Sequence, residues 1–574
     1  MARMARITNR SGDRPARRIR AYNRRAVIDS PARRFVILAA VALALPLSAL
    51  SSVALAKEEQ QPTFRSGVRL VNVNVIAHDN AGQPVKNLTA ADFRIYEDGK
   101  EQKIEVFAIE ADRLAPTPSA ASSTSAPAAV FSNRLAERPG GGVTVILFDR
   151  LNSTWEDQKF ARDQILKLLA NIRSSDRVAL YVLESDAITV LHDFTSEAGR
   201  LIVVLNRYLG TTSVELSRST EAAPDFARSG VAAEDAETEA WLARTTVMVA
   251  EMYLRRRAEL TTNALESIAN HLAGIPGRKN LIWVSGAFPF VIPTDHGPQI
   301  MNKEVNRATR AINSADVAVY PVDIRGLIGA FVNPSAATAT VNRGAAPTAP
   351  VFTTMAYTHP NQDTMREIAE ATGGRVYLNT NAIGEAVRKA IDDSRVSYVL
   401  GYYSSNPAGD NRFRNISVKV NRSGIELRHR KGYLAAPVAV SNSRARLAAL
   451  GRVMLSPIEA SGISLTAEIA RARNEGTIVV RIDPESLTWE QKEDVREAAI
   501  DVVIAQSVPG GKYVTIKETT VRLTADPERY QQMVEDGLTL SSNFTALPDA
   551  YRLHVVVSDV ASQSVGSLII PLKQ

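Results

Sequence analysis

VTVILFDRLNST, residues Val143–Thr154, is the stretch that decides the fold. A nearly continuous apolar run ends at Asp149, and a polar loop follows it at once. Such runs are typical of strands buried on both faces of a parallel α/β sheet. A carboxylate at the carboxyl end of such a strand, with the hydroxyls of Ser153 and Thr154 four and five residues later, lies where a divalent cation or phosphate could bind. The stretch therefore predicts an α/β sheet with a candidate cation site at its edge.

Strand and helix patterns alternate on from this loop, which predicts a doubly wound sheet. The strands expected after it are RVALYVLES (177–185), AITVLHDF (187–194), NLIWVSG (280–286), VAVYPVDIRG (317–326), RVYLN (375–379) and SYVLGYYS (397–404). The expected helices are 157–172, 198–208, 261–273, 302–313, 363–372 and 383–393. The first two of these strands are close enough in sequence to form a hairpin at one edge. Two insertions interrupt the pattern. The first, at 213–260, is polar at first and then helix-prone, and Arg255, Arg256 and Arg257 are expected on a solvated face of it. The second is at 331–360.

β patterns flank this region on both sides. In VRLVNVNVIAHD (68–79) alternate residues are apolar, as a half-buried strand requires, and turn signals follow. FRNISVKVNRSGIELRHRKGYL (413–434) reads as a hairpin that closes the α/β domain, and PGGK (509–512) as a tight turn in a terminal β region. The predicted organisation is a leader at 1–56, a β-sandwich-like module at 57–112, a Pro/Ser/Ala linker at 113–140, the α/β domain at 141–436 and a C-terminal β domain at 437–574.

Charge is distributed unevenly along the chain. Residues 1–34 hold eleven Arg and no Lys against two Asp, which gives this segment +9. Residues 35–56 carry no charge, and the whole chain totals +7, so the residues from Lys57 onward together carry −2. The basic pI thus belongs to the leader, and a nucleic-acid-binding function loses its main support.

The uncharged run FVILAAVALALPLSALSSVALA (35–56) ends in Ala54-Leu55-Ala56, which fits the small-x-small pattern of a signal-peptidase site. We therefore expect an exported protein of the periplasm, cell envelope or extracellular space. The alternative is an uncleaved anchor, because 22 residues are enough to span a bilayer; this leader would then be the chain's only contact with a membrane. The chain has no cysteine, which excludes disulfides, thiolate metal sites and a cysteine nucleophile.

The order of these pieces resembles a von Willebrand factor type A domain, and more closely the exported acidobacterial VWFA-related family. VNVNVIAHDNAGQPVKNLTAADFRIYEDGKEQKIEVF (71–107), VTVILFDRLNST (143–154), GRKNLIWVSGAFPF (277–290), YVLGYYS (398–404) and the 413–434 stretch carry the resemblance. It covers roughly Phe64 to Leu434 and does not extend to the C-terminal domain.

The resemblance implies a metal-ion-dependent adhesion site built from an Asp-x-Ser-x-Ser loop, a Thr and a second Asp. Asp149 and Ser153 match the loop, and Thr211 matches the Thr, with Thr212 the second choice. Leu151 replaces the first Ser and Ser285 the second Asp, so the site is degenerate. Mg²⁺ would have few hard oxygen ligands here. The alternative is structural: Asp149 caps the following turn, and its neighbours satisfy backbone donors.

From these residues we expect a non-enzymatic protein-interaction or adhesion protein. Its partner is expected at the face around the loop, through Arg150, Asn152, Thr154, Trp155 and Ser285, with or without Mg²⁺ held by Asp149, Ser153 and Thr211. One alternative is an envelope structural or assembly scaffold. Another is an envelope hydrolase around Asp149, Ser285 and Asp323, although no esterase elbow, zincin pair or phosphate-binding loop occurs in the sequence. Asp323 is expected two strands from Asp149, more than about 9 Å away.

Overall fold

The structure is a computed structural model that describes most of the chain after residue 69. The predicted leader at 1–56 and most of the insertion predicted at 331–360 lie outside the described residues. No helix among the described residues is long and apolar enough to cross a membrane. The described ranges are 70–111, 130–134, 142–173, 175–185, 188–208, 210–220, 236–286, 290–294, 297–325, 354–380, 382–393, 396–406, 409–410, 412–435, 443–472 and 474–572.

The α/β domain has a five-stranded sheet in the order β12-β9-β6-β7-β8. Its strands are β6 (Val143–Asp149), β7 (Arg177–Leu183), β8 (Ile188–Thr195), β9 (Lys279–Ser285) and β12 (Val317–Asp323). β6, β7, β9 and β12 are parallel, and β8 pairs antiparallel with β7, as the predicted hairpin requires. A small hairpin of β10 (Val291–Thr294) and β11 (Gly297–Ile300) follows β9.

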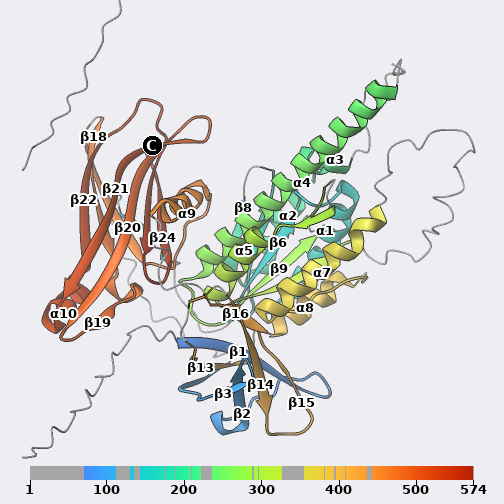
Figure 1. Ribbon diagram of the computed structural model, residues 1–574, viewed down its shortest axis with the longest axis horizontal. Helices are drawn as coiled ribbons and strands as arrows, with labels where there is room; N and C mark the ends of the chain where they lie inside the picture. The colour runs from blue at the N-terminus through green and yellow to red at the C-terminus, as the bar shows by residue number, and fades with distance from the viewer. Residues whose placement is uncertain are drawn as a thin grey trace, which may run out of the picture. The chain divides into compact units, whose positions relative to one another are not determined.

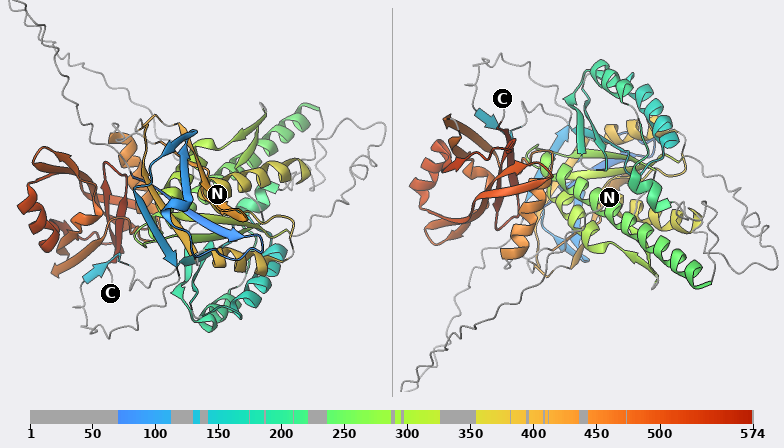
Figure 2. Two further views of the ribbon diagram at one scale, coloured as in Figure 1. Left: turned by 90° about the horizontal axis from the view of Figure 1, so that it is seen from below. Right: turned by 90° about the horizontal axis from the view of Figure 1, so that it is seen from above.

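Helices cover both faces of this sheet, because each central strand buries alternate residues on opposite sides (Figures 1 and 2). Ile146 and Phe148 pack on one face, under α1 (Trp155–Leu169), α2 (Ala198–Arg207) and α8 (Ile383–Asp393). Val145 and Leu147 pack on the other face, under α4 (Ala236–Leu272), α5 (Asn302–Ser314) and α7 (Thr354–Thr372). A short helix α3 (Val214–Thr220) packs on α4. The doubly wound sheet is therefore confirmed.

α4 corrects two expectations. The helix-prone part of the first predicted insertion is not separate from the domain, because residues 236–260 are the first part of one helix that continues through the helix expected at 261–273. The Arg255–Arg257 run does not lie wholly in solvent, because Arg257 is only 2% exposed. The helical repeat places Arg257 on the same face as Thr261, Ala264 and Ile268, which pack toward the sheet.

The first β module is built from two distant segments of the chain. Its sheets have the orders β15-β1-β13-β4 and β16-β14-β2-β3, and they share one hydrophobic core that includes Val73, Ile95, Tyr398 and Ile416. The strands are β1 (Leu70–Asp79), β2 (Phe93–Glu97), β3 (Lys100–Gln102), β4 (Val106–Ala111), β13 (Val396–Tyr403), β14 (Phe413–Val420), β15 (Ile425–Arg428) and β16 (Gly432–Leu434), with a 3₁₀ turn at Ala90–Asp92.

This pairing moves two predicted pieces out of the α/β domain. The strand predicted at 397–404 lies between β1 and β4. The hairpin predicted at 413–434 is divided between the two sheets of the module, because β15 pairs with β1 whereas β14 pairs with β2 and, over three residues, with β16. Alternating apolar residues indicate that a strand has a buried face, but they do not indicate which sheet the strand belongs to. RVYLN also fails to form a strand and makes only a single bridge, between Tyr377 and Val322.

The C-terminal β domain also borrows a distant segment. One sheet has the order β22-β18-β17-β5 and the other β19-β20-β23-β24, with β21 paired to β20; the two share one core. β5 (Val130–Ser132) comes from the predicted linker. The remaining elements are α9 (Ser443–Leu455), β17 (Leu465–Ala472), β18 (Glu475–Ile482), a 3₁₀ turn (Pro484–Ser486), β19 (Glu490–Lys492), β20 (Val495–Val508), β21 (Lys512–Ala525), α10 (Pro527–Asp536), β22 (Leu538–Thr545), β23 (Arg552–Asp559) and β24 (Val565–Pro571).

The β20–β21 hairpin confirms the predicted turn at 509–512. Val508 pairs with Lys512, and both Gly510 and Gly511 have positive φ, at 84° and 69°. Only glycine adopts this region without a steric penalty, which explains the Gly-Gly sequence.

Candidate functional site

Asp149 ends β6, and Ser285 ends the neighbouring strand β9. The strand order reverses between these two strands, since the chain runs from β6 outward to β7 and β8 and then returns to β9 on the other side. In open α/β sheets, ligands bind outside the carboxyl ends of the strands at such a switch point. The loop 150–154 lies there and leads into α1. The fold therefore places the predicted residues at the position where α/β proteins carry function.

The Asp149 carboxylate is buried and fully hydrogen-bonded. It is 0% exposed, and its Oδ1 accepts the backbone N–H of Asn152 at 3.0 Å. Its Oδ2 accepts three donors: Asn152 Nδ2 at 2.8 Å, Trp283 Nε1 at 3.0 Å and Ser285 Oγ at 2.8 Å. Four donors thus occupy the oxygens that a cation would need. The structure favours the structural alternative for Asp149, in which it closes the turn at 149–152.

Asn152 connects this carboxylate to a buried arginine of α4. Its Oδ1 accepts the Nε–H of Arg257 at 3.0 Å, and its Nδ2 also donates to Thr261 Oγ1 at 2.9 Å. Arg257 Nη1 donates to Ser219 Oγ of α3 at 2.7 Å. The Nη2 atom of Arg257 has no hydrogen-bond partner among the described residues. A fixed positive charge therefore lies close to the Asp149 carboxylate without any metal.

Burial shifts the pKa of both charged groups. It raises the pKa of the Asp149 carboxyl, and the hydrogen bonds from Asn152, Ser285 and Trp283 oppose that shift. Burial also lowers the pKa of the Arg257 guanidinium to about 10, while the charges of Asp149 and Glu215 oppose the shift. Arg257 remains protonated at neutral pH, so it partly neutralises the buried carboxylate.

Ser153 and Thr154 complete the turn. Ser153 Oγ donates to the Asp149 carbonyl at 2.5 Å and accepts the backbone N–H of Gly286 at 2.9 Å. Thr154 is the N-cap of α1, and its Oγ1 accepts the backbone N–H of Asp157 at 3.3 Å. These contacts satisfy backbone donors, as the structural alternative expects. Leu151, at the family's first Ser position, is wholly buried in the hydrophobic core under α4.

Thr211 lies near the loop but is paired with an arginine. The Arg150 guanidinium contacts Thr211 Oγ1, Tyr208 Oη and the Glu184 carboxylate, and it lies 4.9 Å above the Tyr208 ring. The Thr211 carbonyl accepts Gln158 Nε2 at 3.0 Å. The oxygen expected to bind a cation therefore faces a positive charge.

These contacts do not fit a divalent cation. The two oxygens of Asp149 accept four hydrogen bonds, Ser153 Oγ already joins two backbone groups, and Thr211 Oγ1 contacts a guanidinium. Mg²⁺ requires near-octahedral hard oxygen ligands, with at least one carboxylate available. Among the described residues, no cluster of three or more His, Asp or Glu side chains is placed to hold a metal.

Ser285 and Asp323, which the hydrolase alternative names together with Asp149, are also buried and hydrogen-bonded within the protein. Ser285 and Asp323 are adjacent in the sheet, and both are 0% exposed. Ser285 donates to Asp149, whereas Asp323 accepts Arg325 Nε at 2.9 Å, Arg325 Nη2 at 2.7 Å and Gln362 Nε2 at 3.3 Å. Asp323 is two strands from Asp149, as expected.

Trp155 is a large exposed side chain next to the loop. It is 48% exposed at the first residue of α1, and Lys159 Nζ lies 5.8 Å from its ring centre. Thr154 and Thr211 are also exposed, while Asn152 and Ser285 are buried. Of the predicted partner-binding residues, Thr154 and Trp155 are therefore accessible, Arg150 is partly accessible, and Asn152 and Ser285 lie beneath the surface.

Sequence reasoning missed three contributors to the network: Trp283, Thr261 and Arg257. The burial of Arg257 could have been predicted, because Arg257, Thr261, Ala264 and Ile268 follow the spacing of a buried helical face. It was not predicted because Arg257 follows two other arginines, and such a run suggests a solvated face. Trp283 gave no signal beyond that of a buried strand residue.

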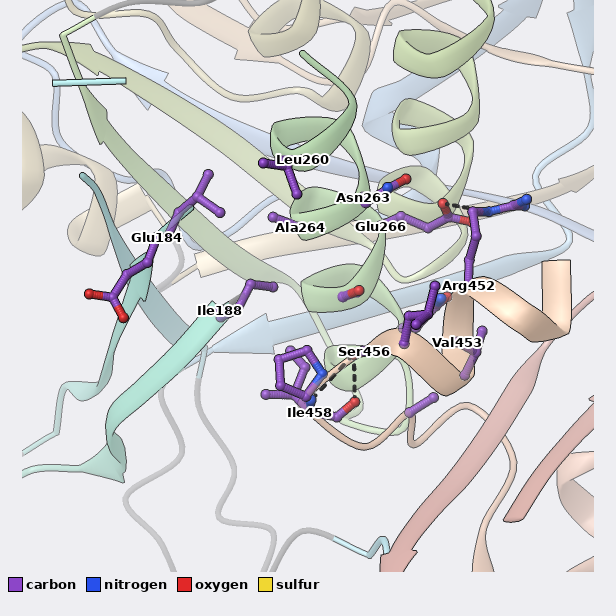
Figure 3. Close-up of a pocket in the computed structure, with 16 residues that line it drawn as sticks. Glu184, Ile188, Leu260, Asn263, Ala264, Glu266, Arg452, Val453, Ser456 and Ile458 are labelled. Atoms are coloured by element: carbon purple, nitrogen blue, oxygen red, sulfur yellow. Dashed lines mark hydrogen bonds and ion pairs between the residues drawn. The ribbon is translucent and has the colours of Figure 1, made fainter. Parts of the chain in front are cut away.

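A cavity of about 240 Å³ lies near the site, between β7, α4 and the segment that follows α9 (Figure 3). Its walls are mainly apolar, and an Arg452–Glu266 ion pair of 3.6 Å lies at its edge. Glu184 lines the cavity and also contacts Arg150. None of the residues predicted for the site lines it.

Comparisons with known proteins give fold neighbours only. No family model and no curated protein matches the chain. The SpRpn10 VWA domain is 13% identical, with a TM-score of 0.16 and coverage of 32% of this chain and 74% of that one. A von Willebrand factor type A protein from Catenulispora acidiphila is 9% identical, with a TM-score of 0.23 and coverages of 82% and 74%.

The pilus adhesin SpaC from Lactobacillus rhamnosus GG is 8% identical, with a TM-score of 0.24 and coverage of 86% of this chain and 59% of that one. At these TM-scores the likeness carries no argument about function. The neighbours thus include von Willebrand A domains, and the assignment of a doubly wound sheet rests on strand order and core packing.

Proposed function

We propose that this chain is an exported, non-enzymatic protein-binding protein, and that its recognition surface is the carboxyl-end face of the α/β sheet around Trp155. We further propose that this surface works without a divalent cation. The observation that carries the proposal is the closed Asp149 turn, in which four donors hold the buried carboxylate and the helix that follows the turn begins with the exposed side chain of Trp155.

The closed turn supports recognition by shape and not by metal coordination. A cation in this face would have to displace Asn152, Trp283 and Ser285 from the carboxylate, and each displaced group would lose a buried hydrogen bond. The turn instead fixes the start of α1 and so the position of Trp155. Trp is among the side chains that are enriched at the positions contributing most of the binding energy of protein interfaces.

The same burial supports a non-enzymatic role. A nucleophile must reach its substrate, whereas Ser285 is wholly buried and donates to Asp149. Support for export comes from the predicted leader alone. The envelope scaffold remains the alternative, and the experiment below separates it, since a spacer needs no contact at Trp155.

The test is capture of a partner from the envelope and secreted fractions on the immobilised full chain, in Mg²⁺ and in EDTA. Trp155→Ala is compared with Tyr403→Ala, a similarly exposed aromatic residue on β13 in the first β module. We expect a partner that binds equally in both buffers, loses more than about tenfold in affinity with Trp155→Ala and is unaffected by Tyr403→Ala.

Calorimetric titration of Mg²⁺ and Mn²⁺ into the wild type and Asp149→Asn gives the second readout. Saturable binding in the wild type that disappears in the variant would overturn the cation-free proposal. A partner that binds Trp155→Ala as tightly as the wild type would overturn the assignment of the recognition surface and favour the scaffold alternative.

A further inference from the structure

The first part of α4 extends well past the sheet. Arg257 meets Asn152 at the carboxyl end of β6, so the 21 residues Ala236–Arg256 precede the level of the site. At about 1.5 Å per residue they extend about 31 Å. Figure 1 shows this end of α4 projecting beyond the strands. Among the described residues, α3 packs on α4 at the base of the projection, where Arg256 lies 3.8 Å from Glu215.

The projecting part carries an apolar seam. Trp241, Met248 and Met252 are 61%, 64% and 58% exposed. With Thr245 they have the spacing 4-3-4, which places all four on one narrow stripe of the helix. Thr245 Oγ1 donates to the Trp241 carbonyl at 2.9 Å, so its hydroxyl is satisfied within α4 and needs no partner. A seam of this spacing fits another helix better than it fits a flat surface.

We propose that the occupant of this seam is a second copy of the same helix, running antiparallel, so that the chain self-associates through α4. A two-fold axis between Thr245 and Met248 would set Trp241 of one copy against Met252 of the partner subunit, and Thr245 against Met248 of the partner subunit. Trp–Met contacts of this kind are favourable, because the polarisable thioether packs well on an aromatic ring.

The order of charged residues beside the seam favours an antiparallel pair of helices over a parallel pair. Glu237, Arg244, Glu251 and Arg255 lie on one flank of the seam, in the order acid, base, acid, base. In an antiparallel pair this flank of one helix faces the same flank of the other helix, which runs in the opposite direction. The acidic and basic side chains of the second helix are therefore met in reverse order. Glu237 then faces Arg255 of the partner subunit, and Arg244 faces Glu251 of the partner subunit. In a parallel pair the flank would not face itself, and the alternation would have no counterpart.

The flank is already ordered in one copy. Arg255 Nη2 lies 2.8 Å from Glu251 Oε1 and 2.7 Å from Gln299 Oε1 of β11. Self-association would extend this pair into a network of four charges at each end. The seam is short, so the buried area falls at the low end for specific interfaces. We therefore expect a dissociation constant on the order of tens of micromolar.

The first test is sedimentation equilibrium of the full chain from about 1 to 200 µM, with Met248→Glu and a matched control, Val203→Glu. Val203 is 49% exposed on α2, away from the seam. We expect concentration-dependent dimers in the wild type and the control, and a loss of at least tenfold in association for Met248→Glu. The proposal would be overturned if the wild type is monomeric at every concentration, or if Met248→Glu dimerises as strongly as the wild type.

A charge exchange tests the direction. Glu237→Arg alone and Arg255→Glu alone should each weaken the dimer, and the double variant should restore it. Restoration requires that the two positions face each other, so two weak single variants without recovery in the double would contradict the antiparallel pair.

The absence of cysteine from the chain allows a direct check of register. Thr245→Cys and Met248→Cys proteins, mixed and oxidised, should form mainly mixed disulfide dimers. In the proposed register, position 245 of one copy faces position 248 of the other within the Cα distance of a disulfide, whereas neither position faces itself. Cross-linking that is instead dominated by Thr245→Cys pairing with itself would indicate a parallel pair and overturn the proposal.

Discussion

At the scale of the residue, Arg257 joins the Asp149 loop to α4. Its guanidinium reaches the Asp149 carboxylate through Asn152. A buried charge is costly unless it is hydrogen-bonded and compensated. Arg257 provides compensation from within the chain, and Asn152 and Ser153 of the loop are buried beside the carboxylate.

Replacing Arg257 tests this role. Arg257→Ala leaves Asn152 Oδ1 without its donor and leaves Asp149 without the nearby positive charge. We expect a loss of about 2–4 kcal/mol in the free energy of unfolding, measured in urea by tryptophan fluorescence. Arg256→Ala is the matched control, because its side chain is 58% exposed and its partner Glu215 lies 3.8 Å away; it should cost less than about 0.5 kcal/mol. Equal effects of the two substitutions would contradict the assignment.

At the scale of the element, β5 shows how a short segment completes a distant domain. Phe131 packs on the core of the C-terminal domain, and Val130, Phe131 and Ser132 pair with β17. Asn133 then fixes the end of this strand. Its Nδ2 donates to the carbonyls of Ala460 and Ile463 at 2.7 and 2.8 Å, and its Oδ1 accepts the N–H of Leu465 at 2.8 Å.

Asn133→Ala should therefore destabilise the C-terminal domain. The substitution leaves three buried backbone groups without their partner, and we expect a loss of about 2–4 kcal/mol. Calorimetric unfolding of the full chain measures the effect as a lower transition for this domain. Asn543→Ala is the control, because Asn543 is exposed on β22 of the same domain and contacts only Thr477 Oγ1, at 2.8 Å, among the bonds identified for its side chain. A shift for Asn133→Ala no larger than that of the control would show that β5 does not fix the domain.

At the scale of the whole molecule, the domains are nested and not arranged in series. β4 ends at Ala111 and β13 begins at Val396, and these two residues are paired neighbours in the sheet. The α/β domain and the β5 strand are therefore inserted between two adjacent strands of the first β module. Hydrogen bonds also join the α/β and C-terminal parts, since Ser461 Oγ donates to the His271 carbonyl at 2.5 Å and accepts the Gly274 N–H at 2.9 Å.

The nesting predicts which fragments fold. Residues 64–111 joined to 396–435 by an Asn-Gly turn should form a stable β module, because a two-residue turn suits adjacent antiparallel strands. Residues 142–435 should aggregate, because β13 and β14 would lack β1, β4 and β2 as neighbours. Circular dichroism and size-exclusion chromatography distinguish the two outcomes. A soluble, monomeric 142–435 fragment would contradict the nested arrangement.

The sequence by itself determined the local features of this protein. Apolar runs and helical spacing predicted the doubly wound sheet, the β7–β8 hairpin, the α8 boundaries and the Gly-Gly turn, because each depends on residues that are close along the chain. The sequence also placed Asp149, Ser153 and Ser285 at one edge of the sheet, since parallel strands bring their carboxyl ends together.

Only the tertiary structure decided which distant segments pair. β13 and β5 have ordinary strand patterns that any sheet with a matching free edge could accept, so their partners follow from packing over hundreds of residues. The state of the Asp149 carboxylate was decided in the same way, because Trp283, Ser285 and Arg257 reach it or its Asn152 neighbour from β9 and α4. Local sequence specifies the donors and acceptors, and long-range packing selects which of them meet.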